Sequence, residues 1–65
     1  MDWIDFLKVM ATEEYAASAR YHWAAQNAEN PQLRTVFAKL RDEEEFHAQF
    51  LEDERVKLEK LLETE

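Results

Sequence analysis

Three side chains in this sequence have the types and spacing of ligands for a transition-metal ion: Glu14, Glu44 and His47. Glu44 and His47 are three residues apart, so one helical face would carry a carboxylate beside an imidazole. Oxygen and nitrogen ligands without sulfur favour iron, or manganese as the alternative metal, over Cu(I) or a structural zinc ion. The sequence contains no cysteine, which excludes thiolate zinc sites and iron–sulfur clusters. These residues therefore predict binding and oxidation of Fe(II).

The elements that must position these residues are helices. The chain has no glycine, its single proline follows Asn30, and most other residues are good helix formers. Asn30 and the proline predict a turn at 30–31, between a helix over about 3–29 and a second helix over about 32–62. Because so short a turn makes the helices antiparallel neighbours, the sequence predicts one all-α domain over 1–65, a two-helix hairpin.

The heights of the three residues along this hairpin agree. Counted along the chain, Glu14 is farther from Asn30 than Glu44 is, and slightly nearer to it than His47 is. Because a helix rises by a constant step of about 1.5 Å per residue, a chain that reverses at Asn30 brings all three to nearly one height. Glu13 is the alternative ligand on the first helix, but its helical stripe includes an arginine, so we favour Glu14.

Alternating steps of four and three residues also place the candidate ligands in apolar seams. The predicted seams consist of Trp3, Leu7, Met10, Glu14, Ala17, Tyr21, Ala24 and Ala28 on the first helix, and of Leu33, Phe37, Leu40, Glu44, His47, Leu51, Glu54, Leu58 and Leu61 on the second. A carboxylate in a packed seam needs a partner. A buried salt bridge between Glu44 and His47, or a shifted seam that exposes both, is the alternative to a metal.

Two further seam residues are candidates for the same site. Glu54 lies two helical turns beyond His47 and could be an additional metal ligand, or an exposed position where the seam frays. Tyr21 could donate a hydrogen bond to a ligand or take part in electron transfer during catalysis, or could simply pack in the core. His22 lies outside the seam, and we expect it to be exposed.

The ligand count predicts a dimer. One hairpin offers two carboxylates and one imidazole, which are too few for an octahedral ion. Two hairpins packed as a four-helix bundle offer four glutamates and two histidines, and two divalent ions would balance the four negative charges. Several large apolar residues lie outside a single seam, so we expect an obligate homodimer or a higher homo-oligomer. They include Trp3, Phe6, Trp23, Phe46 and Phe50.

Composition excludes several other classes of function. The net charge of −7 excludes nucleic-acid binding, which needs clustered Lys and Arg, and suits a protein that attracts cations. No apolar run approaches the roughly 18 residues of a membrane span. The start of the chain is acidic rather than basic, unlike a signal peptide, so we expect a cytoplasmic protein.

The chain resembles the ferritin-like superfamily, in particular rubrerythrin-type half-bundles and the two-helix encapsulated ferritins. The residues that carry the resemblance are Glu14-Tyr15, Ala19-Arg20-Tyr21 and Leu40-Arg41-Asp42-Glu43-Glu44-Glu45-Phe46-His47-Ala48. The resemblance covers roughly residues 11–51. It implies that Glu14, Glu44 and His47 are the ligands of a di-iron ferroxidase centre formed between two subunits. It also implies a cargo protein that oxidises Fe(II) inside an encapsulin nanocompartment.

The expected function is a ferroxidase that oxidises Fe(II) with O2 for iron storage or detoxification. The first alternative is a rubrerythrin-like protein that reduces H2O2 at the same site. Without cysteine, such a peroxidase would need an external electron donor. The second alternative is a helical scaffold without enzymatic activity. No evident encapsulation peptide follows Leu62, which leaves open whether a shell partner exists or the chain is a truncated form.

Overall fold

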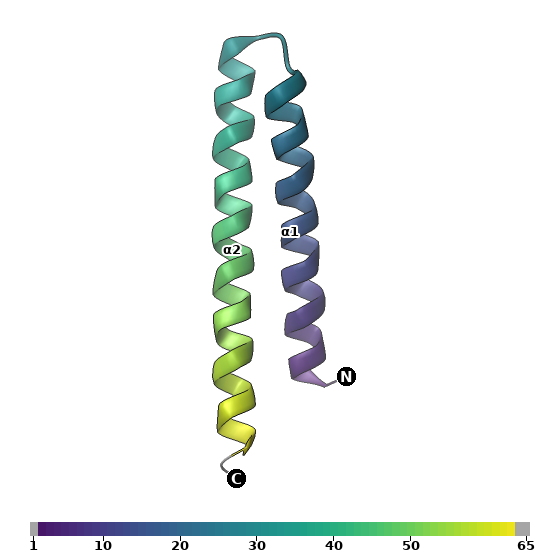
Figure 1. The fold of residues 1–65 in the computed structure, drawn as a ribbon, viewed down its shortest axis with the longest axis vertical. Helices are drawn as coiled ribbons and strands as arrows, with labels where there is room; N and C mark the ends of the chain where they lie inside the picture. Colours follow the sequence, from purple (N-terminus) through teal and green to yellow (C-terminus); the bar gives the residue numbers. More distant parts are fainter. Residues whose placement is uncertain (1, 64–65) are drawn as a thin grey trace.

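Two long helices form the entire described structure, which in this computed structural model covers residues 2–63. Helix α1 spans Trp3–Asn27 and helix α2 spans Pro31–Glu63. They run antiparallel, side by side, and α2 extends beyond the start of α1 at the open end of the hairpin (Figure 1). The predicted all-α hairpin is therefore confirmed. No helix in the described residues is long and apolar enough to cross a membrane.

Side-chain caps fix where both helices begin. The Asp2 carboxylate accepts a hydrogen bond of 2.8 Å from the backbone N–H of Ile4. The Asn30 side-chain oxygen accepts bonds of 2.8 and 3.2 Å from the backbone N–H groups of Gln32 and Leu33. Each cap satisfies donors that have no partner within the helix, which stabilises the helix by about 1 kcal/mol.

The first helix ends earlier than the sequence suggested, at Asn27 rather than near Glu29. Ala28 is extended, with φ −66° and ψ 135°, and its carbonyl accepts a hydrogen bond from the Arg34 guanidinium. This contact ties the end of α1 to the first turn of α2. The chain therefore needs three residues between the helices, and α2 starts at Pro31, whose fixed φ suits the first position of a helix.

Small residues form the contact between the helices. Ala11, Ser18 and Ala48 are the buried residues of the described chain, with exposed fractions of 1%, 5% and 0%. Each lies one position beyond a member of the predicted seam, so both helices are rotated relative to that prediction. The physical reason is that alanine between the helices allows close approach, whereas His47 in that place would be desolvated without a full set of partners.

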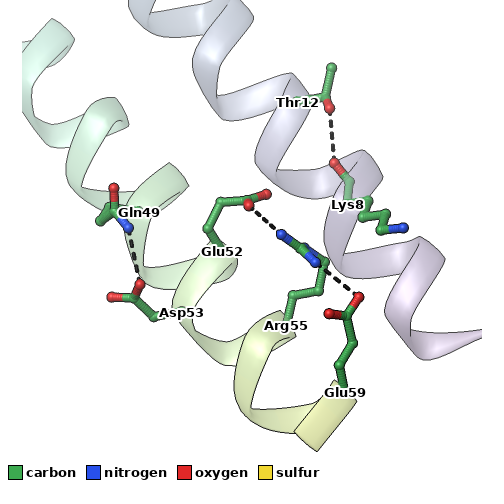
Figure 2. Close-up of polar contacts among 7 residues, drawn as sticks. All are labelled: Lys8, Thr12, Gln49, Glu52, Asp53, Arg55 and Glu59. Carbon is green, nitrogen blue, oxygen red and sulfur yellow. Dashed lines mark hydrogen bonds and ion pairs between the residues drawn. The ribbon is translucent and has the colours of Figure 1, made fainter.

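One side of the hairpin carries polar contacts between and along the helices. The Ser18 hydroxyl donates a hydrogen bond of 3.2 Å to Glu45 across the helix pair. The Arg55 guanidinium bonds to Glu52 at 2.7 Å and to Glu59 at 2.9 Å, as Figure 2 shows. The side chains of Arg55, Glu52 and Glu59 are 20%, 31% and 34% exposed. These carboxylates and the terminal nitrogens of Arg55 therefore have partners within the hairpin, whereas the Nε atom of Arg55 is buried without a hydrogen-bond partner.

Another face of the hairpin is apolar and hollow. It contains a recess of about 440 Å³, lined by Ala17, Arg20, Tyr21, Trp23, Ala24 and Phe37. No large side chain among the described residues is fully buried, and Trp3 and Trp23 are each 67% exposed. Because Ala11 and Ala48 are the only buried apolar residues among residues 2–63, this part of the chain lacks the core that a stable small domain needs. Burial of this surface against another chain would supply that core.

Candidate metal centre

The structure brings Glu14, Glu44 and His47 together at mid-height of the hairpin. One ligand atom from each residue lies within 4.8 Å of the others. The Nδ1 atom of His47 is 3.6 Å from Oε2 of Glu14 and 4.0 Å from Oε1 of Glu44. Among residues 2–63, this is the group of three carboxylate or imidazole side chains arranged so that they could hold an ion. Their role as ligands stays a prediction.

Helical geometry explains why these atoms meet. Glu44 and His47 lie on adjacent turns of α2 and project from one face at i, i+3 spacing. Glu14 projects from α1 at the same height, and the buried Ala48 keeps the helices close at this level. Glu13 is exposed and is not a member of the group, so the structure favours Glu14 over its neighbour.

The electrostatics of the group favour binding of a cation. The Oε2 atom of Glu14 is buried and has no hydrogen-bond partner. Such a buried acceptor is uncommon in folded proteins and calls for a specific explanation. The pKa of Glu44 is raised, chiefly by a side-chain hydrogen bond with Glu14, and further by desolvation and by repulsion from the Glu14 charge. A bound cation would pair with the ionised forms of both carboxylates. It would thereby give the buried Glu14 oxygen a partner and oppose the rise in the pKa of Glu44.

The site is open on one side. The His47 side chain is 54% exposed, whereas those of Glu14 and Glu44 are 30% and 23% exposed. Three protein ligands leave an octahedral ion with free coordination positions. Those positions would be filled by water or by groups from a second molecule that covers the exposed imidazole. The donor set of two carboxylates and one imidazole suits iron or manganese.

The two additional candidates lie outside this group. Glu54 pairs with Lys57 at 3.3 Å instead of approaching His47. Tyr21 stacks on Phe37 with ring centroids 6.5 Å apart and lines the recess. A ligand role for Glu54 and a catalytic role for Tyr21 stay predictions. His22 is exposed as expected, and its Nδ1 atom lies 3.3 Å from the Arg41 guanidinium.

Two features of the site were missed from the sequence. Ala48, directly after His47, sets the separation of the helices, and the bond between Ser18 and Glu45 ties the helices together one turn away. The available signal was the position of a small residue directly after the seam residues Met10, Ala17 and His47. A stripe that is three positions wide, rather than two, would have included them.

Comparison with known proteins gives one family. The family model described as Rubrerythrin matches residues 5–65, which is nearly the whole chain. No curated protein and no solved structure matches the sequence significantly.

Proposed function

The chain belongs to the rubrerythrin family of di-iron helical proteins, and we propose that it is a ferroxidase whose Glu14, Glu44 and His47 bind Fe(II) as substrate. The observation that carries this proposal is the buried Oε2 atom of Glu14, which faces a histidine and a second carboxylate but has no hydrogen-bond partner. An atom in this position is explained by a cation that the three side chains share.

The complete site needs two copies of the chain. One hairpin supplies two carboxylates and one imidazole, and His47 faces solvent on the open side of the group. A second hairpin packed against that side doubles the set to four carboxylates and two imidazoles. Two Fe(II) ions then neutralise the four carboxylates, which makes so many acids tolerable inside a four-helix bundle. The site would thus form together with the dimer.

The reaction follows from this arrangement. Two Fe(II) ions give up one electron each, and O2 takes up both electrons and two protons to form H2O2, leaving two Fe(III). The chain's own residues hold the ions at a fixed separation and supply negative charge that favours the ferric product. Glu44 would bind Fe(II) as the ionised carboxylate, so the bound cation would oppose the neighbouring Glu14 charge and the desolvation that raise the pKa of Glu44.

Anaerobic loading with Fe(II), followed by exposure to O2, tests the proposal. We expect about one iron per chain and oxygen uptake well above that of iron in buffer. Glu14→Ala, Glu44→Ala and His47→Ala should each abolish the enzyme-dependent uptake. Glu13→Ala is the matched control, because Glu13 is exposed and outside the group. Oxidation no faster than in buffer, or equal losses in the control, would show that this site is not a ferroxidase centre.

A second candidate function is favoured by the family itself. The matching model is named for rubrerythrin, so reduction of H2O2 at the same site is the alternative reaction. The chain contains no cysteine, so such a reaction would need an external electron donor. Adding H2O2 or O2 to the ferrous protein and comparing the two rates of reoxidation separates the functions. Iron storage inside an encapsulin shell stays a prediction from the resemblance.

A further inference from the structure

The recess and the metal group lie on the same face of the hairpin. On α1, Glu14, Ala17, Tyr21 and Ala24 follow one another at steps of three and four residues and so share a helical face. The last three of these residues line the recess. The polar contacts made by Ser18 and Arg55 involve other faces of the helices. The apolar recess therefore lies along the same face of α1 as Glu14, toward the turn between the helices.

Residue size along this face of α1 changes at the level of Glu14. The positions repeat every seven residues and read Trp3 and Met10 before Glu14, then Ala17 and Ala24 after it. Trp3 precedes Glu14 by nearly the same separation as Ala24 follows it, and Met10 and Ala17 flank Glu14 about one helical turn away on either side. A second α1 that runs in the opposite direction, with its Glu14 at the same height, thus places each large residue opposite a small one.

We propose that this recess binds the aromatic end of α1 from a second copy of the chain, with the two α1 helices antiparallel across the interface. Trp3 and Phe6 form an edge-to-face pair with centroids 5.6 Å apart, and this pair projects from α1 with Trp3 exposed. Its counterpart is a hollow with the Tyr21 and Phe37 rings among its lining residues. Large residues entering small-residue recesses give the interlocked packing that stabilises helical interfaces.

The Arg20 guanidinium lies where it can contact an aromatic ring of the second copy. Arg20 lies in the lining of an otherwise apolar recess, between one and two helical turns after Glu14. Phe6 lies about two helical turns before Glu14. In the antiparallel arrangement, Arg20 of one copy and Phe6 of the other come within about one helical turn in height. A guanidinium over an aromatic ring contributes attraction beyond that of apolar contact.

The two-fold axis of this antiparallel arrangement, perpendicular to the helices, also relates the two α2 helices. An axis perpendicular to the helices at the height of His47 pairs Leu40 of one copy with Glu54 of the other, because the two positions are equally far from His47 along the chain. It also brings the two His47 side chains to one height, where they complete the metal group. The axis inferred from residue size on α1 and the axis through His47 coincide, because Glu14 and His47 are 3.6 Å apart.

In the competing arrangement, the two-fold axis of the dimer runs parallel to the helices. Helix α1 of one copy then lies against α2 of the other. This arrangement would place recess beside recess at one end and aromatic pair beside aromatic pair at the other. Unfilled recesses lose contacts, and crowded aromatic pairs force strain, so this arrangement packs less well. The metal ligands alone do not separate the two arrangements, since all of them lie at mid-height in both.

Cysteine cross-linking separates them, because the natural chain contains no cysteine. We would mix the single variants Met10→Cys and Ala17→Cys, refold them together, and treat them with an oxidant that forms disulfides. Covalent heterodimers should form in the mixture and not in either variant alone. Like positions in the two copies are separated by about 10 Å along the axis, too far for a disulfide. Thr12→Cys mixed with Ala19→Cys has the same spacing on exposed positions and is the matched control.

A reciprocal exchange of residue size tests the fit of the recess. Trp3→Ala and Ala24→Trp should each weaken the dimer roughly tenfold or more, measured by sedimentation. The double variant should recover most of this loss, because the large residue and the small one have only changed places. Ala19→Trp introduces the same side chain at an exposed position and should leave dimerisation unchanged. The proposal would be overturned if the dimer affinity of the double variant is lowered by as much as the losses of the two single variants combined.

The inference rests on the dimer of the proposed function, yet the two can fail separately. Cross-linking is carried out with EDTA and again with Mn(II), without any measurement of iron oxidation. Cross-links between Ala17→Cys and Glu43→Cys chains, with none between Met10→Cys and Ala17→Cys, would show that α1 lies against α2 of the other copy. That result, or a monomer under both conditions, refutes the antiparallel α1 contact. Rapid cross-linking in a protein that does not oxidise Fe(II) would refute only the ferroxidase.

Discussion

Replacement of Glu14 by methionine is expected to stabilise the metal-free protein and to abolish its stabilisation by metal. The Oε2 atom of Glu14 is buried without a hydrogen-bond partner, next to a second carboxylate. A buried acceptor without a partner costs about 1–3 kcal/mol. Since the Glu14 side chain is 30% exposed, solvent screening reduces this to the lower end, roughly 1 kcal/mol. Methionine has a similar volume and can pack against the small residues nearby.

Thermal unfolding followed by circular dichroism measures both effects at one fixed protein concentration. In EDTA, Glu14→Met should unfold about 4–8 °C above the natural protein, as expected for roughly 1 kcal/mol in a domain of this size. Anaerobic Fe(II) or Mn(II) at about 100 times its Kd should stabilise the natural protein by about 2.7 kcal/mol and leave the variant unchanged. The order of stability of the two proteins therefore reverses when metal is added.

Glu13→Met is the matched control, because Glu13 is the exposed neighbour of Glu14. Its unfolding free energy should stay within about 0.5 kcal/mol of the natural protein, with the metal-dependent rise intact. The reasoning is refuted if Glu14→Met is less stable than the natural protein in EDTA. The buried Glu14 oxygen would then be stabilised by partners in the metal-free protein. Retention of the metal-dependent rise in Glu14→Met would equally refute its place among the ligands.

Three further perturbations have expected outcomes. Because the pKa of Glu44 is raised, its contribution to metal-free stability is present below about pH 4.5 and is lost as pH rises through the raised pKa. Melting in EDTA across this range measures the effect, and Glu44→Gln should remove it. Metal affinity should fall as pH decreases, because protons compete with the metal for all three ligands, and a metal titration at several pH values checks this. Ala48→Leu should lower the free energy of unfolding by about 1–3 kcal/mol and weaken metal binding, because the larger side chain forces the helices apart. Ala19→Leu at an exposed position should have neither effect. Urea unfolding and metal titration measure the two effects. Asp2→Ala should cost about 1 kcal/mol in urea unfolding by removing the cap of α1, whereas Asp5→Ala should cost less.

The sequence by itself determined the helices and the residues of the candidate site. A chain without glycine and with a single Asn-Pro pair has one place to reverse, so local propensity alone predicted a hairpin. Once the turn was located, the constant rise of a helix brought Glu14 level with Glu44 and His47. These conclusions depend on local rules, and a stretch of chain obeys such rules wherever it lies.

Only the tertiary structure decided how each helix is rotated about its axis. Neighbouring positions on a helix differ by about 100°, and a broad apolar stripe tolerates rotation by part of that angle. Packing chose Ala48 rather than His47 for the helix contact, because two backbones approach closely only where side chains are small. That choice turned the imidazole of His47 toward the open side of the site. It also decided that Ala17 and Tyr21 line a recess, which no local rule could have shown.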